Sequence, residues 1–254
     1  MKILAITQAR IGSSRFPEKI LQTINGESLL EMHLKRIQKS KLITKIKVAT
    51  TTEPDAEKIV DIASKLGIEV YKGSLTNVLE RFFETALPEQ PDWIVRLTSD
   101  CPFIDAKEID HVIKYALKHD LDYVSNSLQP TYPDGIDVEV FKYSALVRAM
   151  KEAKLTSELE HVTPYIWKNS SFKGGNLFTS DCVTNEVDYS AVRLTVDTYE
   201  DFLVIEKLVQ ILGTECSWQE YVKAIEEHAE IKKINARFER NEGYERSIKQ
   251  DKNI

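Results

Sequence analysis

Cysteine is scarce in this sequence of 254 residues, which has three, Cys101, Cys182 and Cys216. They are widely separated and odd in number, so they predict neither a disulfide framework nor the close pairs typical of zinc sites. Free thiols of this kind are typical of a reducing compartment. We therefore expect a cytoplasmic protein.

Long apolar runs and an excess of positive charge are also missing. No run approaches the ~20 apolar residues that a membrane-spanning helix needs, and the apolar start at residues 1–6 is too short for a signal peptide. The formal net charge is −6, which argues against broad nucleic-acid binding. We expect no membrane partner and no nucleic-acid partner.

Strand-like and helix-like patterns alternate through the first half of the chain. Short β-prone runs lie at residues 3–6, 45–50, 68–71 and 93–97, and patterns typical of helices lie at 28–38, 54–67, 78–87 and 105–117. This alternation predicts an α/β fold, in which a mostly parallel sheet is covered by helices on both faces.

The second half is less regular. Strands are predicted at 122–125, 137–141, 174–179 and 192–195, and a helix at 157–167, capped by Ser157 and Glu160 and broken near Pro164. Residues 126–190 are therefore interpreted as a peripheral layer that carries substrate contacts and a dimer surface. From Asn235 the chain is polar and charged, and we expect it to fray.

The most informative segment directly follows the first predicted strand and reads Gln8-Ala9-Arg10-Ile11-Gly12-Ser13-Ser14-Arg15-Phe16-Pro17-Glu18-Lys19. In open α/β sheets, ligands bind beyond the carboxyl ends of the strands. Arg10, Arg15 and Lys19 are charged donors for phosphate oxygens, and Gly12 lets backbone N–H groups approach an anion. The order of residues matches neither the dinucleotide glycine fingerprint nor a Walker A loop. The alternative is a solvated basic loop.

This loop resembles the signature loop of the cytidylyltransferases that make CMP-activated acidic sugars, among them the enzymes for KDO and for sialic-type acids. It is more similar still to the SpsF-like cytidylyltransferases. Four further stretches support the resemblance in the family's order, at residues 77–82, 96–104, 160–165 and 193–198. The resemblance covers most of the chain and implies a Rossmann-like nucleotidyltransferase fold with a small peripheral β/helix insertion. It implies one domain over residues 1–235, with a polar tail over 236–254.

The resemblance also implies a reaction. CMP would pass from CTP to an acidic sugar, or to a related phosphorylated or phosphonate small molecule, with release of pyrophosphate, in surface polysaccharide or glycan biosynthesis. Mg²⁺, with Mn²⁺ as an alternative, is the implied cofactor, and a homodimer is the implied assembly. Two other functions stay open: transfer from another nucleoside triphosphate, and a catalytically idle binding protein.

Two carboxylates are implied as metal ligands. Asp100 follows the predicted strand at 93–97, and Asp197 follows the one at 192–195. Mg²⁺ prefers one or two protein carboxylates together with substrate phosphates. The alternative for each is an ordinary turn or helix-capping aspartate. Arg193, beside Asp197, is interpreted either as a phosphate donor or as a partner for a carboxylate.

The remaining site residues follow from the same resemblance. The residues assigned to catalysis are Arg10, Lys19 and Asp100. The residues assigned to the nucleotide are Gln8, Ala9, Arg10, Gly12, Ser13, Ser14, Arg15, Lys19 and Arg81. The residues assigned to the acceptor are Asp134, Asp137, Glu139, Glu160 and His161. The alternatives are an ion pair of Arg81 with Glu80 or Glu84, an ordinary Asp-Gly turn at residues 133–139, and a structural role for His161. The role of Asn77, where the family often has an acidic residue, stays open.

Overall fold

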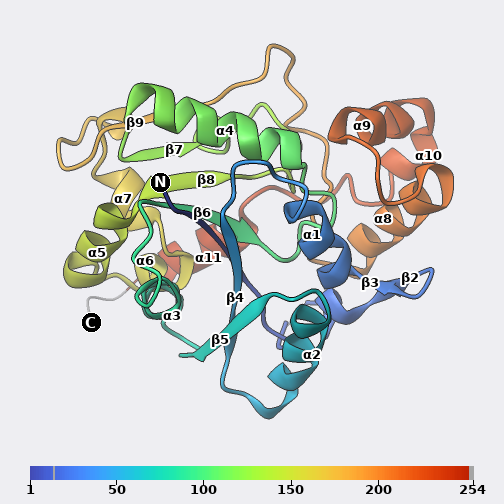
Figure 1. Cartoon of the computed structure of the whole chain (residues 1–254). Coiled ribbons are helices and arrows are strands. Elements are labelled where there is room, and N and C mark those ends of the chain that lie inside the picture. The colour runs from blue at the N-terminus through green and yellow to red at the C-terminus, as the bar shows by residue number, and fades with distance from the viewer. Residues whose placement is uncertain (14, 252–254) are drawn as a thin grey trace.

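The computed structural model describes residues 1–13 and 15–251. Seven strands of this part form one sheet in the order β5-β4-β1-β6-β8-β7-β9 (Figure 1). The strands of the sheet are β1 (Ile3–Gln8), β4 (Lys45–Thr51), β5 (Glu69–Gly73), β6 (Trp93–Thr98), β7 (Tyr123–Ser125), β8 (Glu139–Lys142) and β9 (Ser180–Cys182). A separate short hairpin joins β2 (Thr23–Ile24) to β3 (Glu27–Ser28).

Helices cover both faces of the sheet, as the alternation of patterns predicts. They are α1 (Leu29–Ile37), α2 (Glu57–Lys65), α3 (Val78–Ala86), α4 (Ala106–His119), α5 (Tyr143–Glu152), α6 (Thr156–His161), α7 (Pro164–Lys168), α8 (Tyr199–Leu212), α9 (Trp218–Glu227), α10 (Ala229–Lys232) and α11 (Glu242–Lys249). Successive side chains of β1 point to opposite faces. Ile3 and Ala5 pack with α1, α4, α8 and α9, whereas Leu4 and Ile6 pack with α3, α5 and α7. The predicted α/β fold is confirmed.

Strand β8 lies inside the sheet, although it falls within the segment interpreted as peripheral. It pairs antiparallel with both β6 and β7, whereas the other ladders of this sheet are parallel. Val140 belongs to the core on one face and Phe141 to the core on the other. A strand that is buried on both faces is part of the core.

Three local predictions in the second half are wrong. The segment 192–195 forms an isolated bridge between Arg193 and Asp134 instead of a strand, and the strand expected at 174–179 is β9 instead. The predicted break near Pro164 is confirmed, because α6 ends at His161 and α7 begins at Pro164. The expected cap by Ser157 and Glu160 is not formed. Helix α6 begins one residue before Ser157, and the Glu158 carboxylate accepts the Leu155 N–H at 3.1 Å instead.

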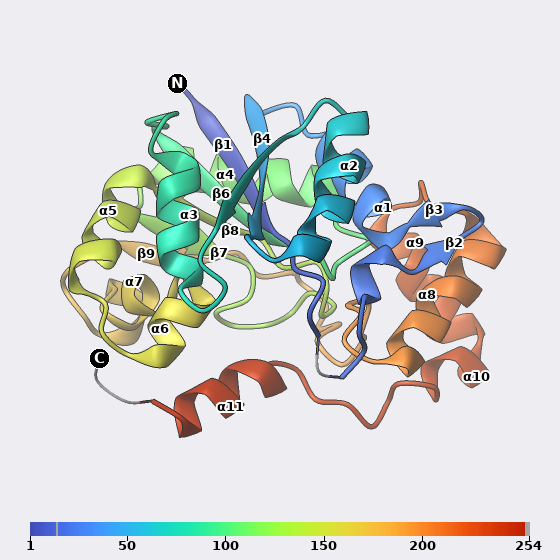
Figure 2. The ribbon, with the colours of Figure 1, turned by 90° about the horizontal axis from the view of Figure 1, so that it is seen from below.

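The expectation that the tail frays is also wrong for residues 236–251. Helix α11 packs against α6, and Figure 2 shows it running along the lower edge of that view, beneath the strands and loops. Ser247 is buried, and the Asp251 carboxylate accepts the Ser157 N–H at 2.7 Å and its hydroxyl at 2.9 Å. Polar contacts with the body of the protein therefore hold a segment that has little apolar surface of its own.

In the part of the chain that the structure describes, no helix is long and apolar enough to cross a membrane.

We predict that His33 makes stability fall in mild acid. Its buried ring donates from Nδ1 to the Cys101 carbonyl at 2.9 Å and accepts at Nε2 from the Thr7 hydroxyl at 2.9 Å. Burial lowers the pKa of His33 to about 4, while the unfolded chain binds the proton near pH 6.5. The unfolded state therefore gains the proton first, and stability is lost as pH falls from about 6.5 to 4, by roughly 3 kcal/mol at the limit. Urea unfolding at pH 7 and pH 4.5 measures the loss, and an NMR titration in which the His33 ring protonates near pH 6.5 would contradict it.

Candidate functional site

A cavity of about 840 Å³ opens beyond the carboxyl ends of β1 and β6. It brings together all the predicted site residues that the structure describes. Its lining includes Gln8, Ala9, Arg10, Gly12, Ser13, Arg15, Lys19, Arg81, Asp100, Asp134, Asp137, Glu139, Glu160, His161 and Asp197. Ser14, which was assigned to the nucleotide, lies outside the described residues. The position of the cavity agrees with the rule for ligand sites in open α/β sheets.

Lys19 lies between the two carboxylates that were assigned to the metal. Its Nζ donates to Asp100 Oδ2 at 2.8 Å and to Asp197 Oδ1 at 2.8 Å. Burial lowers the pKa of Lys19, but the two carboxylates outweigh it, so the pKa is raised. Burial likewise raises the pKa of Asp100, and Lys19 more than offsets this effect, so that the pKa is held below its usual range. Lys19 and Asp100 are therefore both charged at neutral pH.

Neither of these aspartates caps a helix. Asp105 caps α4, with its carboxylate accepting from the Lys107 N–H at 2.8 Å. Thr198 caps α8, where it forms a capping box with Asp201. The capping alternative for Asp100 and Asp197 is thereby excluded, and both residues line the cavity.

The donor set fits a magnesium ion that is shared with a substrate. Asp100 and Asp197 converge on the same ammonium atom, so their oxygens can reach one cation together. Among the described residues, no group of three or more His, Cys, Asp or Glu side chains could hold a metal by itself. Two carboxylates suit Mg²⁺, which takes its other ligands from phosphates and water.

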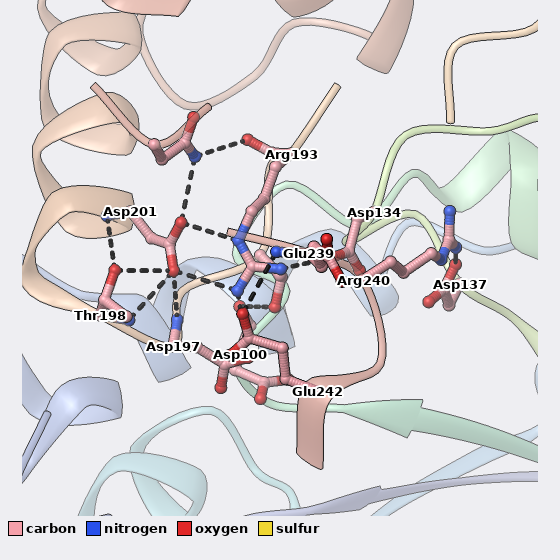
Figure 3. A network of polar contacts seen from close by, with 12 residues as sticks. Asp100, Asp134, Asp137, Arg193, Asp197, Thr198, Asp201, Glu239, Arg240 and Glu242 are labelled. Carbon is pink, nitrogen blue, oxygen red and sulfur yellow. Dashed lines mark hydrogen bonds and ion pairs between the residues drawn. The ribbon is translucent and has the colours of Figure 1, made fainter. Parts of the chain in front are cut away.

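Arg193 links the segment that contains Asp197 to the turn that contains Asp134 (Figure 3). Its guanidinium donates to Asp134 Oδ2 at 2.6 Å, to Asp201 Oδ1 at 2.8 Å and to Asp197 Oδ2 at 3.1 Å. Of the two interpretations of Arg193, the structural partner of carboxylates is therefore the one observed. Sequence analysis missed Asp201, which is fully buried. Its spacing of three residues after Thr198 was the available signal, since this spacing is typical of a capping box.

Gly135 allows the two segments that Arg193 joins to approach each other. Its φ angle is +105°, and an added Cβ would lie 2.6 Å from the Thr195 backbone nitrogen. Gly12, in contrast, has no positive φ, and a Cβ there would meet no atom within 4 Å. Packing against the rest of the described chain therefore requires a glycine at position 135 but not at position 12.

Two of the arginines that were assigned to the nucleotide, Arg15 and Arg81, differ in their partners. Arg15 forms ion pairs with Asp197 at 2.9 Å and with Glu242 at 3.0 Å. Arg81 is buried and donates to the Ser74 carbonyl at 2.6 Å, and the structure contains no ion pair between it and Glu80 or Glu84. Burial, aided by the charge of Arg10, lowers the pKa of Arg81 to about 10. Within the described ranges Arg81 forms no ion pair, and the nearby charge of Glu53 offsets only part of the effect of burial on its pKa. Asn77 caps α3, which gives that open position a structural role.

The carboxylates that were assigned to the acceptor are already engaged with the protein. Asp137 pairs with Arg240, and Glu139 binds Arg96 and accepts from the Tyr123 and Thr163 hydroxyls. Burial, together with the charge of Asp137, raises the pKa of Asp134 to about 7. Sequence analysis missed Arg96 and Arg240. Arg96 was hidden within a strand pattern, and the polar segment that contains Arg240 carries no periodic signal.

The model of the cytidylyltransferase family matches residues 4–247. The chain belongs to the cytidylyltransferase family. The prediction of a CTP-dependent nucleotidyltransferase is thereby confirmed, as is the predicted resemblance. A solved cytidylyltransferase from Leptospira borgpetersenii is 33% identical, covers 91% of this chain and 96% of its own, and superposes with a TM-score of 0.85.

The name of one curated relative gives a pathway, and the name of another gives an activity. The spore coat polysaccharide biosynthesis protein SpsF of Bacillus subtilis is 31% identical over 218 residues, which are 83% of this chain and 88% of SpsF. A 3-deoxy-manno-octulosonate cytidylyltransferase of Chlorobaculum tepidum is 35% identical over 115 residues, 44% of this chain and 45% of that protein. The likeness to the second protein is therefore confined to less than half of each chain.

We predict that Gly135→Ala destabilises the fold more than Gly174→Ala. Both glycines have a positive φ, which costs another residue roughly 1–3 kcal/mol, but a Cβ at position 174 would meet nothing within 4 Å. The overlap with the backbone at Thr195 should therefore add a further cost at position 135 alone. Melting temperatures of the two variants test this difference. Equal melting temperatures would show that the approach of residues 134–135 to 193–195 is not tight.

Proposed function

We propose that this enzyme transfers CMP from CTP to an acidic small molecule, a sugar acid or a phosphorylated or phosphonate compound, in surface polysaccharide or glycan biosynthesis. An oxygen of the acceptor attacks the α-phosphorus of CTP, the bond to the β-phosphate oxygen breaks, and pyrophosphate leaves. The proton of an attacking hydroxyl passes to solvent. Family membership supports the transfer chemistry, and the named activities of the two curated relatives support a sugar acid and a polysaccharide pathway.

The observation that carries this proposal is the convergence of Lys19, Asp100 and Asp197 at one end of the cavity. We assign Asp100 and Asp197 to Mg²⁺, which would neutralise charge on the triphosphate when bound; Mn²⁺ is the alternative. Lys19, Arg10 and Arg15 would then bind phosphate oxygens, and the buried cation of Arg81 would add to the attraction for the nucleotide. Asp134, Asp137, Glu139, Glu160 and His161 line the same cavity, and we assign them to its acceptor half.

Pyrophosphate release is the direct test of this function. The four nucleoside triphosphates would each be offered with ulosonic acids, phosphonates and phosphorylated polyols. Release with CTP and one acid supports the proposal. Release with another triphosphate would favour the alternative donor, and the absence of any release would favour a binding protein. The homodimer and the cytoplasmic location stay predictions of the sequence.

We predict that Asp100→Asn and Asp197→Asn abolish most of the metal-dependent turnover. Each change keeps the shape of the side chain but removes a hard anionic ligand from the ion. Since neither residue caps a helix, circular dichroism should remain that of the wild type. Pyrophosphate release over a Mg²⁺ titration measures the effect, and Asp92→Asn, at the opposite end of β6, is the matched control. If either site variant retains a normal rate and a normal metal midpoint, that residue is not a ligand.

We predict that Lys19→Ala weakens CTP binding by roughly 1.5–3 kcal/mol, the contribution of a hydrogen bond to a charged group. The variant also leaves Asp100 and Asp197 without their shared cation, so affinity should be measured with saturating Mg²⁺. Lys58→Ala is the control, because Lys58 pairs with Glu18 on the surface outside the cavity. Calorimetry that gives the same CTP affinity for both variants would remove the phosphate role of Lys19.

A further inference from the structure

The C-terminal helix α11 forms one wall of the cavity. The cavity-lining residues of this region are Asn241, Glu242, Gly243, Tyr244, Arg246, Ser247 and Gln250. Gly243, Ser247 and Gln250 are spaced by four and three residues, so they lie on one face of the helix, and Arg246 lies three residues after Gly243 on the same side. Lys249 occupies the same last turn but does not line the cavity.

The helix is held at the acceptor end by two residues that were assigned to the acceptor. The Ser247 hydroxyl donates its single proton to Glu160 Oε2 at 2.7 Å and accepts from His161 Nε2 at 2.9 Å. Burial lowers the pKa of His161 to about 4, so the ring is neutral at pH 7 and donates from one nitrogen. Glu160 and His161 are therefore positioning residues for α11.

Aromatic packing holds the helix at the same place. The Tyr244 ring packs edge-on against the His161 ring, with centroids 5.1 Å apart, and against Trp167, with centroids 5.8 Å apart. At the start of the helix, Glu242 pairs with Arg15 of the nucleotide loop at 3.0 Å. Helix α11 thus contacts both a residue assigned to the nucleotide and two residues assigned to the acceptor.

Three of the carboxylates that were assigned to the acceptor already have partners within the protein. Asp134, Asp137 and Glu139 each pair with an arginine of the protein. Arg246 makes no ion pair with any described residue, and Lys173 lies over the Phe172 ring at 5.5 Å. Arg246 thus lines the cavity with a guanidinium that has no carboxylate partner among the described residues. The helix dipole favours a basic residue in the last turn of a helix. Lys249 lies in that turn without lining the cavity, so the dipole does not explain why Arg246 lines it.

We propose that α11 is part of the acceptor site and that Arg246 binds the anionic group of the acceptor. The group is a carboxylate or a phosphate, both of which match the planar fork of a guanidinium. This inference rests on the proposed function in taking the acceptor half of the cavity as the binding place of a second substrate. It makes Arg246 a residue that selects charged acceptors over neutral ones.

The test is calorimetric titration of the full-length protein with three probes in the presence of CTP without metal. The probes are an ulosonic acid, glycerol phosphate and a neutral hexose, so that a carboxylate and a phosphate are distinguished. Arg246→Ala should weaken binding of the anionic probe by roughly tenfold to hundredfold. Arg246→Lys should restore part of the affinity, and Lys249→Ala should bind as the wild type does. The affinity for CTP should be the same in all four proteins.

Each outcome decides between the alternatives. Equal binding of the anionic probe by Arg246→Ala and Lys249→Ala overturns the inference, as does a wild-type protein that binds neither anion. Binding of an anion that depends on Arg246, without pyrophosphate release when Mg²⁺ is added, supports the inference and removes the proposed function. Pyrophosphate release that does not depend on Arg246 supports the proposed function and overturns the role of Arg246.

Discussion

The ammonium group of Lys19 is the interaction on which the site depends. Asp100 and Asp197 lie 97 residues apart in the sequence, and each approaches the same nitrogen atom to 2.8 Å. Two carboxylates this close repel each other unless a cation lies between them. The cation ties the loop after β1, the end of β6 and the segment before α8 into one wall. A divalent ion would meet the same electrostatic need, and Lys19 would then be free to bind phosphate.

Arg193, behind Lys19 and its two carboxylates, keeps that wall in place. Arg193 joins Asp134, Asp197 and Asp201 through three different nitrogen atoms, and Gly135 allows the backbones to approach closely enough for it to do so. Buried ion pairs of this kind contribute little net stability, because desolvation offsets much of the attraction. Their effect here is geometric. They fix the direction of the carboxylates before any ligand binds, so that less order has to be created on binding.

Much of the first half of the molecule could be predicted from the sequence. The periodicity of residues 28–38 and 93–97 reflects burial against the sheet, and Asp100 follows from its place at the end of a buried strand. The second half could not be predicted so well, because its geometry depends on contacts between distant segments. The segment 192–195 has strand composition but pairs only at Arg193, whose partner Asp134 is 59 residues away. No local pattern encodes such a pair.

Helix α11 is the clearest case of a tertiary contact that overrides local composition. Its sequence is polar, and a helix of eight residues is unstable alone in water. It forms because Ser247, Tyr244 and Asp251 find partners on α6 and α7. A helix held mainly by polar contacts and one aromatic ring is easier to undock than a core helix. The chain has a net charge of −6, yet Arg10, Arg81 and Arg246 line the cavity without an ion pair among the described residues. Any attraction that Arg246 exerts on an anionic ligand is local, and it requires α11 to stay docked.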